Sequence, residues 1–219
     1  MRRKELLRSV AALIDARPRA PVLLVAIDGV DGAGKTVFAE ELAPFLGSPV
    51  MRASIDGFHN PRSVRYARGK ASPEGFYFDS FNLAELRNAL LDPLRPGGSG
   101  LYRTAAFDHR TDAPVDLPTL SAQSGSVLLF DGIFLHRPEL RDIWDFSVFL
   151  DVDREETLRR CLAREGIEGI SSDPSDPVHA RYVQGQEIYL KACNPKEQAT
   201  IVIDNNDLER PFLVSTGEK

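Results

Sequence analysis

The sequence has little cysteine, no apolar run of membrane length and no signal-peptide pattern in its first residues. Its two cysteines, Cys161 and Cys193, do not form a C-x-x-C pair, which indicates buried or incidental thiols in a reducing compartment. None of its apolar runs reaches the roughly 18 residues of a membrane span. Met1–Arg17 has apolar residues at helical spacing but lacks the apolar core and cleavage site of a signal peptide. We therefore expect a cytoplasmic protein without a membrane partner.

The sequence also lacks an excess of positive charge. It has 27 Lys and Arg residues against 32 Asp and Glu residues, so the net charge is −5. A nucleic-acid surface would need a basic face, and here basic residues are mixed with acidic ones. We therefore expect a small-molecule substrate and no nucleic-acid partner. With 219 residues, 42% of them hydrophobic, the chain suits one α/β domain with a full core.

One motif in the sequence is more informative about function than any other. The apolar run Val22–Ile27 is followed by Gly29–Thr36, which reads G-x-x-x-x-G-K-[ST]. In this Walker A loop the glycines let backbone N–H groups surround phosphate oxygens, and the following helix points its positive end at them. Lys35 can reach the β- and γ-phosphates, and the Thr36 hydroxyl can ligate Mg²⁺. The sequence therefore predicts ATP and Mg²⁺ as cofactors, with nucleotide contacts from Gly29, Asp31, Gly32, Ala33, Gly34, Lys35, Thr36 and Val37.

Strand and helix patterns alternate along the chain, which predicts an α/β fold of the P-loop NTPase class. We expect a mostly parallel sheet with helices on both faces and a small lid, within a single domain spanning 1–219. The strands are expected at 22–28, 49–55, 126–130, 146–150 and 200–203, and the helices at 35–46, 83–94, 155–164 and 178–191. Other expected segments are an N-terminal helix in 1–20, an insertion at 57–125, a lid at 164–178 and a weakly ordered tail at 207–219.

Polar side chains directly follow several expected strands, where ligands of such sheets bind. Asp131 ends the apolar run Val127–Phe130 as in a Walker B strand, which predicts a role with Thr36 in holding Mg²⁺. The alternative is an aspartate that caps the following turn. Asp56 follows the second strand and could take the proton of an acceptor hydroxyl, or else serve only as an Asp-Gly turn residue.

The stretches around Asp79 and between Tyr102 and Arg110 are rich in aromatic residues, as a small-molecule pocket requires. The alternative is that these aromatic residues complete the core. Arg160 and Arg164 lie four residues apart on one helix, just before the expected lid. They could neutralise charge on the transferring phosphoryl group, or else form pairs such as Glu156 with Arg160 on a solvated helix face.

Taken together, these motifs resemble the uridine kinase and phosphoribulokinase family of P-loop kinases over about residues 22–206. Beyond the phosphate loop, the resemblance rests on Asp56-Gly57-Phe58-His59, Ser72-Pro73-Glu74-Gly75, Phe78-Asp79-Ser80-Phe81, Tyr102-Arg103-Thr104, Phe107-Asp108-His109-Arg110, Phe130-Asp131-Gly132-Ile133-Phe134, Thr157 to Arg164 and Ile201-Val202-Ile203-Asp204-Asn205. It implies a five-stranded parallel sheet with a lid.

The resemblance also implies roles for single residues. Asp56 matches the family's catalytic base, Asp131 its metal ligand and Asp79 its acidic ribose contact, while His109 is the expected contact to the base. Arg160 and Arg164 match the lid arginines, and with Asp56 and Lys35 they form the expected catalytic set. The expected acceptor-binding residues are Asp56, His59, Asp79, Tyr102, Phe107, His109 and Arg110.

The implied activity is ATP-dependent phosphorylation of a metabolite hydroxyl, with the 5′-hydroxyl of uridine or cytidine, a pyrimidine salvage reaction, as the leading acceptor. Thr104-Ala105-Ala106 stands where the family's pyrimidine pocket begins with Tyr-Asp-Phe. The alternatives are therefore pantothenate, a sugar, nicotinamide riboside or a sugar phosphate, the last needing a basic cluster such as Arg62, Arg65, Arg68 and Lys70. An ATP-binding regulatory switch is a further alternative, GTP is an open alternative donor, and members of the family are often homo-oligomers.

Overall fold

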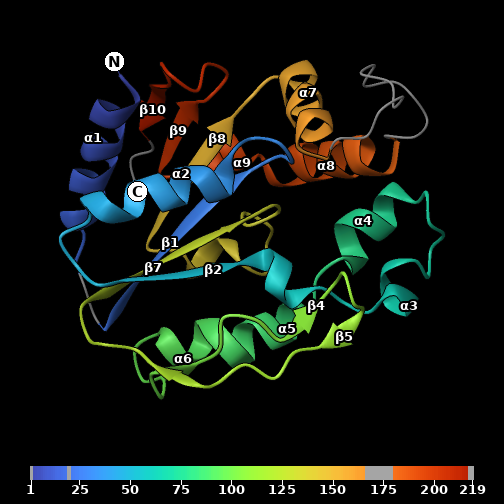
Figure 1. Ribbon diagram of the computed structural model, residues 1–219, viewed down its shortest axis with the longest axis horizontal. Coiled ribbons are helices and arrows are strands. Elements are labelled where there is room, and N and C mark those ends of the chain that lie inside the picture. The colour runs from blue at the N-terminus through green and yellow to red at the C-terminus, as the bar shows by residue number, and fades with distance from the viewer. Residues whose placement is uncertain (1, 19–20, 166–179, 217–219) are drawn as a thin grey trace.

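A six-stranded sheet lies at the centre of the protein, whose computed structural model describes residues 2–18, 21–165 and 180–216 (Figure 1). Its strands run in the order β10-β9-β8-β1-β7-β2. All neighbouring strands are parallel except β10, which is antiparallel to β9. The predicted parallel sheet is therefore confirmed, with one added strand. The bounds are β1 (Val22–Gly29), β2 (Val50–Ser54), β7 (Ser126–Gly132), β8 (Phe146–Asp151), β9 (Ile201–Asp204) and β10 (Phe212–Thr216).

The prediction of a weakly ordered tail at 207–219 is wrong over the part of the tail that the structure describes. Phe212–Thr216 forms β10 on the open edge of β9, with a register irregularity between Leu213 and Ser215. Sequence reasoning missed this strand because Phe212 and Val214 are about half exposed, so the segment lacks the apolar run that marked the central strands. Its backbone hydrogen bonds come from the neighbouring strand, which no local pattern reveals.

Helices cover both faces of the sheet, which explains why β1 is apolar from Val22 to Ile27 and buried at all eight positions. Leu23, Val25 and Ile27 pack into the core cluster that also holds α1 (Arg3–Asp15) and α2 (Lys35–Leu42). Leu24 and Ala26 belong to the opposite cluster, which includes side chains of α4 (Pro73–Asp79) and α8 (Ala180–Cys193).

The helices lie close to the ranges that the sequence predicts, with local differences in where they begin, end or are interrupted. α2 begins at Lys35, and a 3-10 turn (Ala43–Phe45) replaces its predicted last turn. The predicted helix 83–94 consists of α5 (Leu83–Leu86), a π turn (Arg87–Leu91) and α6 (Asp92–Leu94). The other short elements are a 3-10 turn η2 (Ile55–Phe58), α3 (Arg62–Arg65), β3 (Leu101–Tyr102), β4 (Phe107–Asp108), β5 (Ala113–Pro114), β6 (Leu120–Ser121), a 3-10 turn (Arg141–Ile143) and α9 (Pro195–Gln198).

The predicted lid at 164–178 lies outside the described residues, except for its first two positions at the end of α7 (Arg154–Glu165). Within the described part of the chain, no helix is long and apolar enough to cross a membrane.

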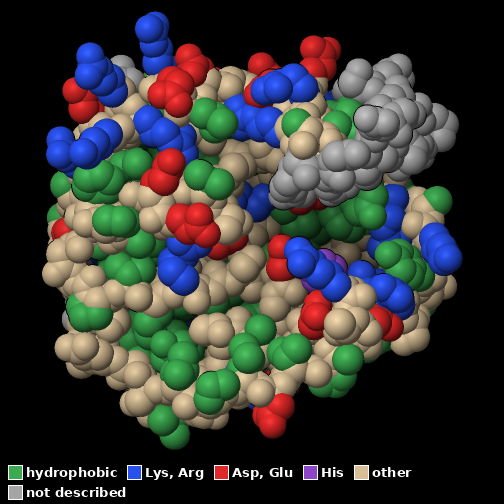
Figure 2. Space-filling view, viewed as in Figure 1, with side chains coloured by type: hydrophobic (Ala, Val, Ile, Leu, Met, Phe, Trp, Pro, Cys, Tyr) green, Lys and Arg blue, Asp and Glu red, His purple; other side chains and the backbone are tan. Residues whose placement is uncertain are grey.

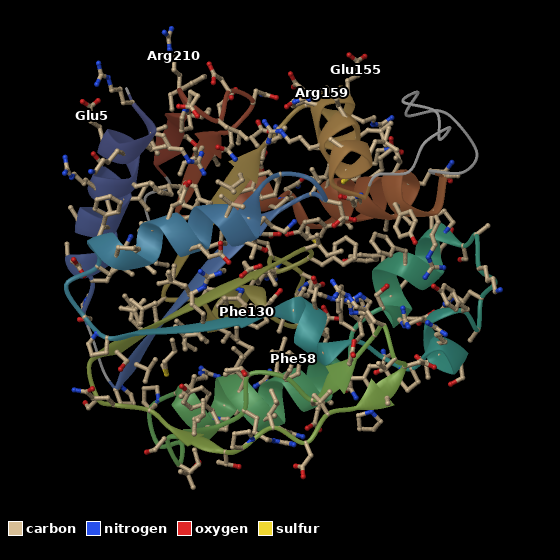
Figure 3. All side chains as sticks on the ribbon, viewed as in Figure 1. Glu5, Phe58, Phe130, Glu155, Arg159 and Arg210 are labelled. Atoms are coloured by element: carbon tan, nitrogen blue, oxygen red, sulfur yellow. The ribbon has the colours of Figure 1, made fainter. Side chains whose placement is uncertain are left out.

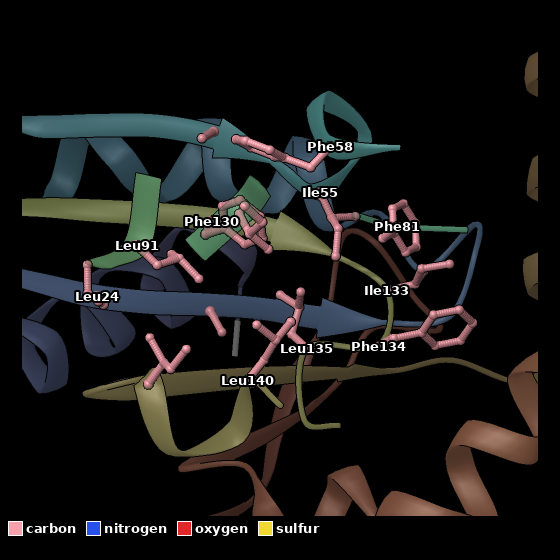
Figure 4. Packing of buried hydrophobic residues seen from close by; sticks show 14 of the residues in the cluster. Leu24, Ile55, Phe58, Phe81, Leu91, Phe130, Ile133, Phe134, Leu135 and Leu140 are labelled. Carbon is pink, nitrogen blue, oxygen red and sulfur yellow. The ribbon is translucent and has the colours of Figure 1, made fainter. Parts of the chain in front are cut away.

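The core beneath the ends of β1, β2 and β7 is built from aromatic and aliphatic side chains (Figure 4). Phe58 and Phe130 are almost completely buried there, and Phe134 is fully buried against Phe81. This packing gives the loops at the strand ends a rigid floor, because protein interiors are close-packed and resist displacement.

Candidate active site

Three segments that carry predicted phosphate-binding, metal-binding and catalytic residues meet at one edge of the sheet. β7 lies between β1 and β2, so Ser54 is paired with Asp131 and Ile27 is paired with the same residue from the other side. The phosphate loop follows β1 and Asp56 follows β2 by two residues. The sheet therefore places the loop 29–36, Asp131 and Asp56 side by side at the carboxyl ends of adjacent strands, as the sequence predicts.

The phosphate loop has the backbone that its glycines predict. Gly32 and Gly34 have φ angles of 77° and 86°, in the left-handed region that favours glycine. A Cβ on Gly32 would also lie 2.4 Å from the carbonyl oxygen of Thr157. Lys35 Nζ donates to the carbonyl oxygen of Val30 at 2.8 Å, so the ammonium lies against the loop. The loop is thus shaped to hold phosphate oxygens on its backbone N–H groups.

Side chains from two distant elements brace this loop. Gln186 on α8 accepts a hydrogen bond from the Asp31 N–H at 2.6 Å. Asn205, directly after β9, donates to the carbonyl oxygen of Ala33 at 2.8 Å and is fully buried. Arg3 on α1 in turn donates to the Asn205 side-chain oxygen at 3.0 Å. The conformation of the loop therefore depends on the ends of the chain as well as on its own glycines.

The oxygens expected to hold Mg²⁺ lie next to each other. The Thr36 hydroxyl donates to Asp131 Oδ2 at 2.8 Å, and Arg52 on β2 donates to Asp131 Oδ1 at 3.0 Å. A hydroxyl and a carboxylate are the hard ligands that Mg²⁺ prefers, and substrate phosphates and water complete its shell. No group of three or more His, Cys, Asp or Glu residues within the described ranges could hold a metal alone. The pair therefore fits a metal bound together with a triphosphate.

Asp56 lies on the 3-10 turn after β2 and has an exposed side chain. Its Oδ1 is 3.6 Å from Nε2 of His59, and the Asp56 side chain is 68% exposed against 13% for His59. The neighbouring imidazole is the chief cause of a lowered pKa of Asp56, partial desolvation opposes it, and the charges of Lys35 and His109 lower the pKa further. Asp56 is therefore a carboxylate at neutral pH.

The predicted acceptor residues His59 and His109 are in contact, with ring centroids 4.7 Å apart. Burial is the first cause that lowers the pKa of His109, and repulsion from His59 adds to it. Figure 2 shows a hollow on this face with hydrophobic side chains inside it and a histidine beside basic and acidic side chains at its rim. The structure therefore brings His59 and His109 together next to Asp56.

The other predicted acceptor residues are farther from being free to contact an acceptor, because they are paired, buried or on a separate turn. Asp79 Oδ2 accepts from Arg68 Nε at 2.7 Å, so its carboxylate is engaged in an ion pair. Tyr102 on β3 is 6% exposed and belongs to the core cluster, as the alternative reading of the aromatic residues expected. Phe107 on β4 is half-buried and lies opposite Pro114, and Arg110 is exposed in the turn that follows.

The arginines of α7 face in different directions. Arg159 pairs with Glu156 and is 67% exposed on the outer side of the helix (Figure 3). Arg160 also pairs with Glu156, at 2.7 Å, but donates to the carbonyl oxygens of Asn205 and Asn206 at 2.9 and 2.7 Å. Its other terminal nitrogen reaches the Gly32 carbonyl oxygen at 3.5 Å, which places Arg160 beside the phosphate loop. Arg164 lies on the last turn of α7, and its side chain is outside the described part.

Sequence reasoning missed a buried network behind the phosphate loop. Asp28, the last β1 residue before Gly29, is fully buried and accepts hydrogen bonds from Gly29 N–H, His136 Nδ1 and the Tyr189 hydroxyl. Burial and the Asp28 carboxylate raise the pKa of Tyr189 well above its usual value. Asp28 alone carried a signal, because it follows a strand directly. His136 and Tyr189 reach it from distant segments, as Arg52 reaches Asp131.

The chain matches proteins of known family over most of its length. The model of the Phosphoribulokinase / Uridine kinase family matches residues 24–204. The chain belongs to this family. A uridine kinase of Chlamydia pneumoniae is 25% identical over 190 residues, covering 84% of this chain and 82% of that protein. An inorganic pyrophosphatase, TTM2, of Arabidopsis thaliana is 26% identical over 160 residues, and the match covers 72% of this chain but only 22% of that longer protein.

The fold is also found in solved structures. A possible uridine kinase from Bacillus stearothermophilus superposes with a TM-score of 0.70 at 22% identity, covering 91% of this chain and 97% of that one. This likeness confirms the P-loop kinase fold. Membership of the family identifies the protein as a kinase of P-loop type, and the identities leave its acceptor to be argued from the site.

Proposed function

We propose that the protein transfers the γ-phosphoryl group of ATP to a hydroxyl of a small metabolite, with the 5′-hydroxyl of uridine or cytidine as the leading acceptor. The observation that carries the proposal is the position of Asp56. It is an exposed carboxylate two residues after β2, beside the strand whose Asp131 accepts from Thr36 of the phosphate loop. A base on the acceptor side of the phosphates is what a kinase needs and a nucleotide switch does not.

The roles of the other residues follow from their positions. Backbone N–H groups of the loop 29–36 and the Lys35 ammonium bind the phosphates, and Thr36 and Asp131 would hold Mg²⁺. When bound, the metal ion neutralises charge on the phosphate oxygens. Arg160 keeps the loop in place through Gly32 and adds positive charge nearby. Asp56 orients the acceptor hydroxyl and accepts its proton as the new bond forms.

The surroundings of Asp56 favour an acceptor without a phosphate group. Two arginines that could bind such a phosphate are already paired, Arg65 with Asp112 at 3.3 Å and Arg68 with Asp79 at 2.7 Å. A phosphate group bound by these two arginines would compete with their carboxylate partners. The half-buried imidazole of His109, which packs on His59, offers a hydrogen-bonding group that suits a nucleoside. Four similar proteins named uridine kinase support the same choice.

The experiment that tests the proposal is ADP formation by the purified protein with Mg²⁺-ATP across a panel of acceptors. The panel contains uridine, cytidine, adenosine, nicotinamide riboside, pantothenate, ribulose 5-phosphate and fructose. We expect rapid, acceptor-dependent turnover with uridine or cytidine, and the monophosphate as product. Asp56→Asn serves as the control, because it should lower acceptor-dependent turnover by about 10²- to 10⁴-fold and leave any slow ATP hydrolysis by water.

Turnover with another member of the panel would keep the mechanism and replace the acceptor. Slow hydrolysis that no acceptor stimulates, with ATP still bound, would contradict the proposal and favour the regulatory switch. Replacing ATP by GTP in the same assay identifies the donor.

A further inference from the structure

We propose that His59 is a proton relay of the phosphoryl transfer: it takes from Asp56 the proton that the acceptor hydroxyl releases. This inference rests on the proposed function, because it requires Asp56 to act as the base. It assigns a chemical step to a side chain that sequence reasoning expected only to contact the acceptor.

The hydrogen bonding of the ring decides which nitrogen can take a proton. Nδ1 of His59 lies 3.1 Å from the carbonyl oxygen of Ser80. A carbonyl oxygen only accepts hydrogen bonds, so Nδ1 carries a hydrogen in this contact. Nε2 is therefore the nitrogen that can gain or lose a proton, and it faces Asp56 Oδ1 at 3.6 Å. A shift of well under 1 Å would bring the two atoms within hydrogen-bonding distance.

The ring is held in this orientation from several sides. Its centroid lies 4.5 Å from that of Phe81 and 4.7 Å from that of His109. The backbone of His59 forms an isolated bridge with Phe81, which fixes the base of the side chain. With 13% of its side chain exposed, against 68% for Asp56, His59 is the more buried member of the pair, and the Asp56 carboxylate is the one open to solvent. A proton acceptor placed in this way needs little reorganisation during the reaction.

The charged groups around the pair favour transfer in this direction. The pKa of Asp56 is lowered, so its carboxyl group holds a proton poorly at neutral pH. The groups that face the pair are His109, in the turn after β4, and Lys35, in the phosphate loop. Arg65 on α3 lies behind His109, 3.4 Å from its carbonyl oxygen. The Lys35 ammonium favours an ionised Asp56, and the Asp56 carboxylate is a partner of opposite charge for the imidazolium that forms when His59 takes the proton.

Atoms and charges balance in the proposed transfer. A lone pair of the acceptor oxygen attacks the γ-phosphorus while the bond from that phosphorus to the β–γ bridging oxygen breaks, and its electron pair leaves on ADP. The proton of the acceptor hydroxyl passes to Asp56 and then to the lone pair on Nε2 of His59. Asp56 is again a carboxylate, paired with the imidazolium, which finally releases the proton to water. One proton is therefore released for each phosphoryl group transferred.

Single-turnover rates, measured together with the KM values for the acceptor and for ATP, test this role, because single turnovers exclude product release from the measured rate. His59→Asn keeps an N–H that can donate to the Ser80 carbonyl oxygen but removes the Nε2 lone pair. We expect it to lower the single-turnover rate by up to about 10²-fold while both KM values change little.

His109→Asn is the matched control, because it alters the neighbouring imidazole in the same way. We expect it to change the KM for the acceptor while the single-turnover rate at saturating acceptor stays close to that of the wild type. If His59→Asn keeps the wild-type single-turnover rate, or if His109→Asn lowers this rate as much as His59→Asn does, the relay is wrong.

A second measurement does not depend on turnover. In protein labelled with ¹³C at aspartate carboxyl groups, the Asp56 carboxyl should titrate at higher pH in His59→Asn than in the wild type, because the chief cause that lowers its pKa is gone. An unchanged titration would show that the two side chains are not coupled and would overturn the relay.

A failure of the proposed function can be distinguished from a failure of the relay alone. If no acceptor is phosphorylated by the wild type, the proposed function fails, whatever the titration shows. If the wild type turns over normally and His59→Asn has the same single-turnover rate, the proposed function stands and only the relay fails. Binding of a non-hydrolysable ATP analogue by His59→Asn confirms that this variant is folded.

Discussion

Two carboxylates at the same sheet edge have opposite surroundings, and these surroundings separate their roles. Asp131 is 3% exposed and accepts from both Thr36 and Arg52, so its oxygens are fixed. Asp56 is 68% exposed and has only a loose contact, 3.6 Å, to His59. A fixed carboxylate beside the phosphate loop suits a metal ligand, whereas an exposed one suits a group that must meet a substrate.

This contrast predicts the behaviour of Asp56→Asn. The substitution removes the proton acceptor but keeps the size of the side chain, so kcat should fall by about 10²- to 10⁴-fold. The affinity for ATP should hold, because Asp56 lies on the acceptor side. Steady-state kinetics and calorimetric ATP binding measure the two effects, and near-full activity would remove Asp56 from the mechanism.

Lys35→Ala tests the phosphate loop at the same scale. The ammonium lies against the loop, where it donates to the Val30 carbonyl oxygen, and its charge matters most when negative charge builds up in the transition state. We expect a loss in kcat at least as large as that of Asp56→Asn. Turnover that stays intact would show that the assignment of the loop is wrong in detail.

Among the elements, α8 connects the two halves of the site. Its Gln186 binds the Asp31 N–H of the phosphate loop, and its Tyr189 binds Asp28 just before that loop. One turn before Tyr189, Gly185 packs against Phe76 of α4, the helix that ends at Asp79. A displacement of α8 would therefore reach the nucleotide side and the acceptor side together.

Gly185→Ala tests this connection. A Cβ at this position would lie 2.7 Å from Phe76 Cδ1 and 2.9 Å from the Pro73 carbonyl oxygen, so α4 must move away. We expect the free energy of unfolding to fall by about 1–3 kcal/mol and the KM for the acceptor to rise. Gln184→Ala, at an exposed position on the same helix, is the control and should change stability little. Denaturant unfolding of both variants provides the comparison, and equal stabilities would contradict the tight contact.

For the whole molecule, stability should depend on the nucleotide. The phosphate loop is held by α8 through Gln186, by Asn205 after β9 and, through Asn205, by Arg3 of α1. Since elements from both ends of the chain support the loop, a ligand that binds it should stabilise the fold as a unit.

This linkage can be measured. A non-hydrolysable Mg²⁺-ATP analogue at about 100 times its Kd should raise the free energy of unfolding by about 2.7 kcal/mol. Lys35→Ala should show a smaller increase at the same concentration of the analogue. Thermal unfolding with and without the analogue gives the result, and an equal increase in both proteins would mean that the ligand binds elsewhere.

The sequence by itself determined the parallel sheet and the phosphate loop, because both depend on local patterns. Apolar runs such as Val22–Ile27 need burial on both faces, and the glycines of the loop have φ angles that few other residues adopt. Ligands of parallel sheets bind at the carboxyl ends of the strands, and from this rule Asp56 and Asp131 are expected at the same edge of the sheet. These parts could be predicted without any long-range contact.

Only the tertiary structure decided how these residues are paired. Tyr189 meets Asp28 across 161 positions of the chain, Arg52 meets Asp131 across 79, and β10 finds its hydrogen bonds on β9. It also placed Tyr102 in the core and set the more buried His59 beside Asp56. Such contacts join segments that are distant in sequence, so they depend on how the sheet and helices pack. No hydrophobic period or short motif in the sequence indicates them.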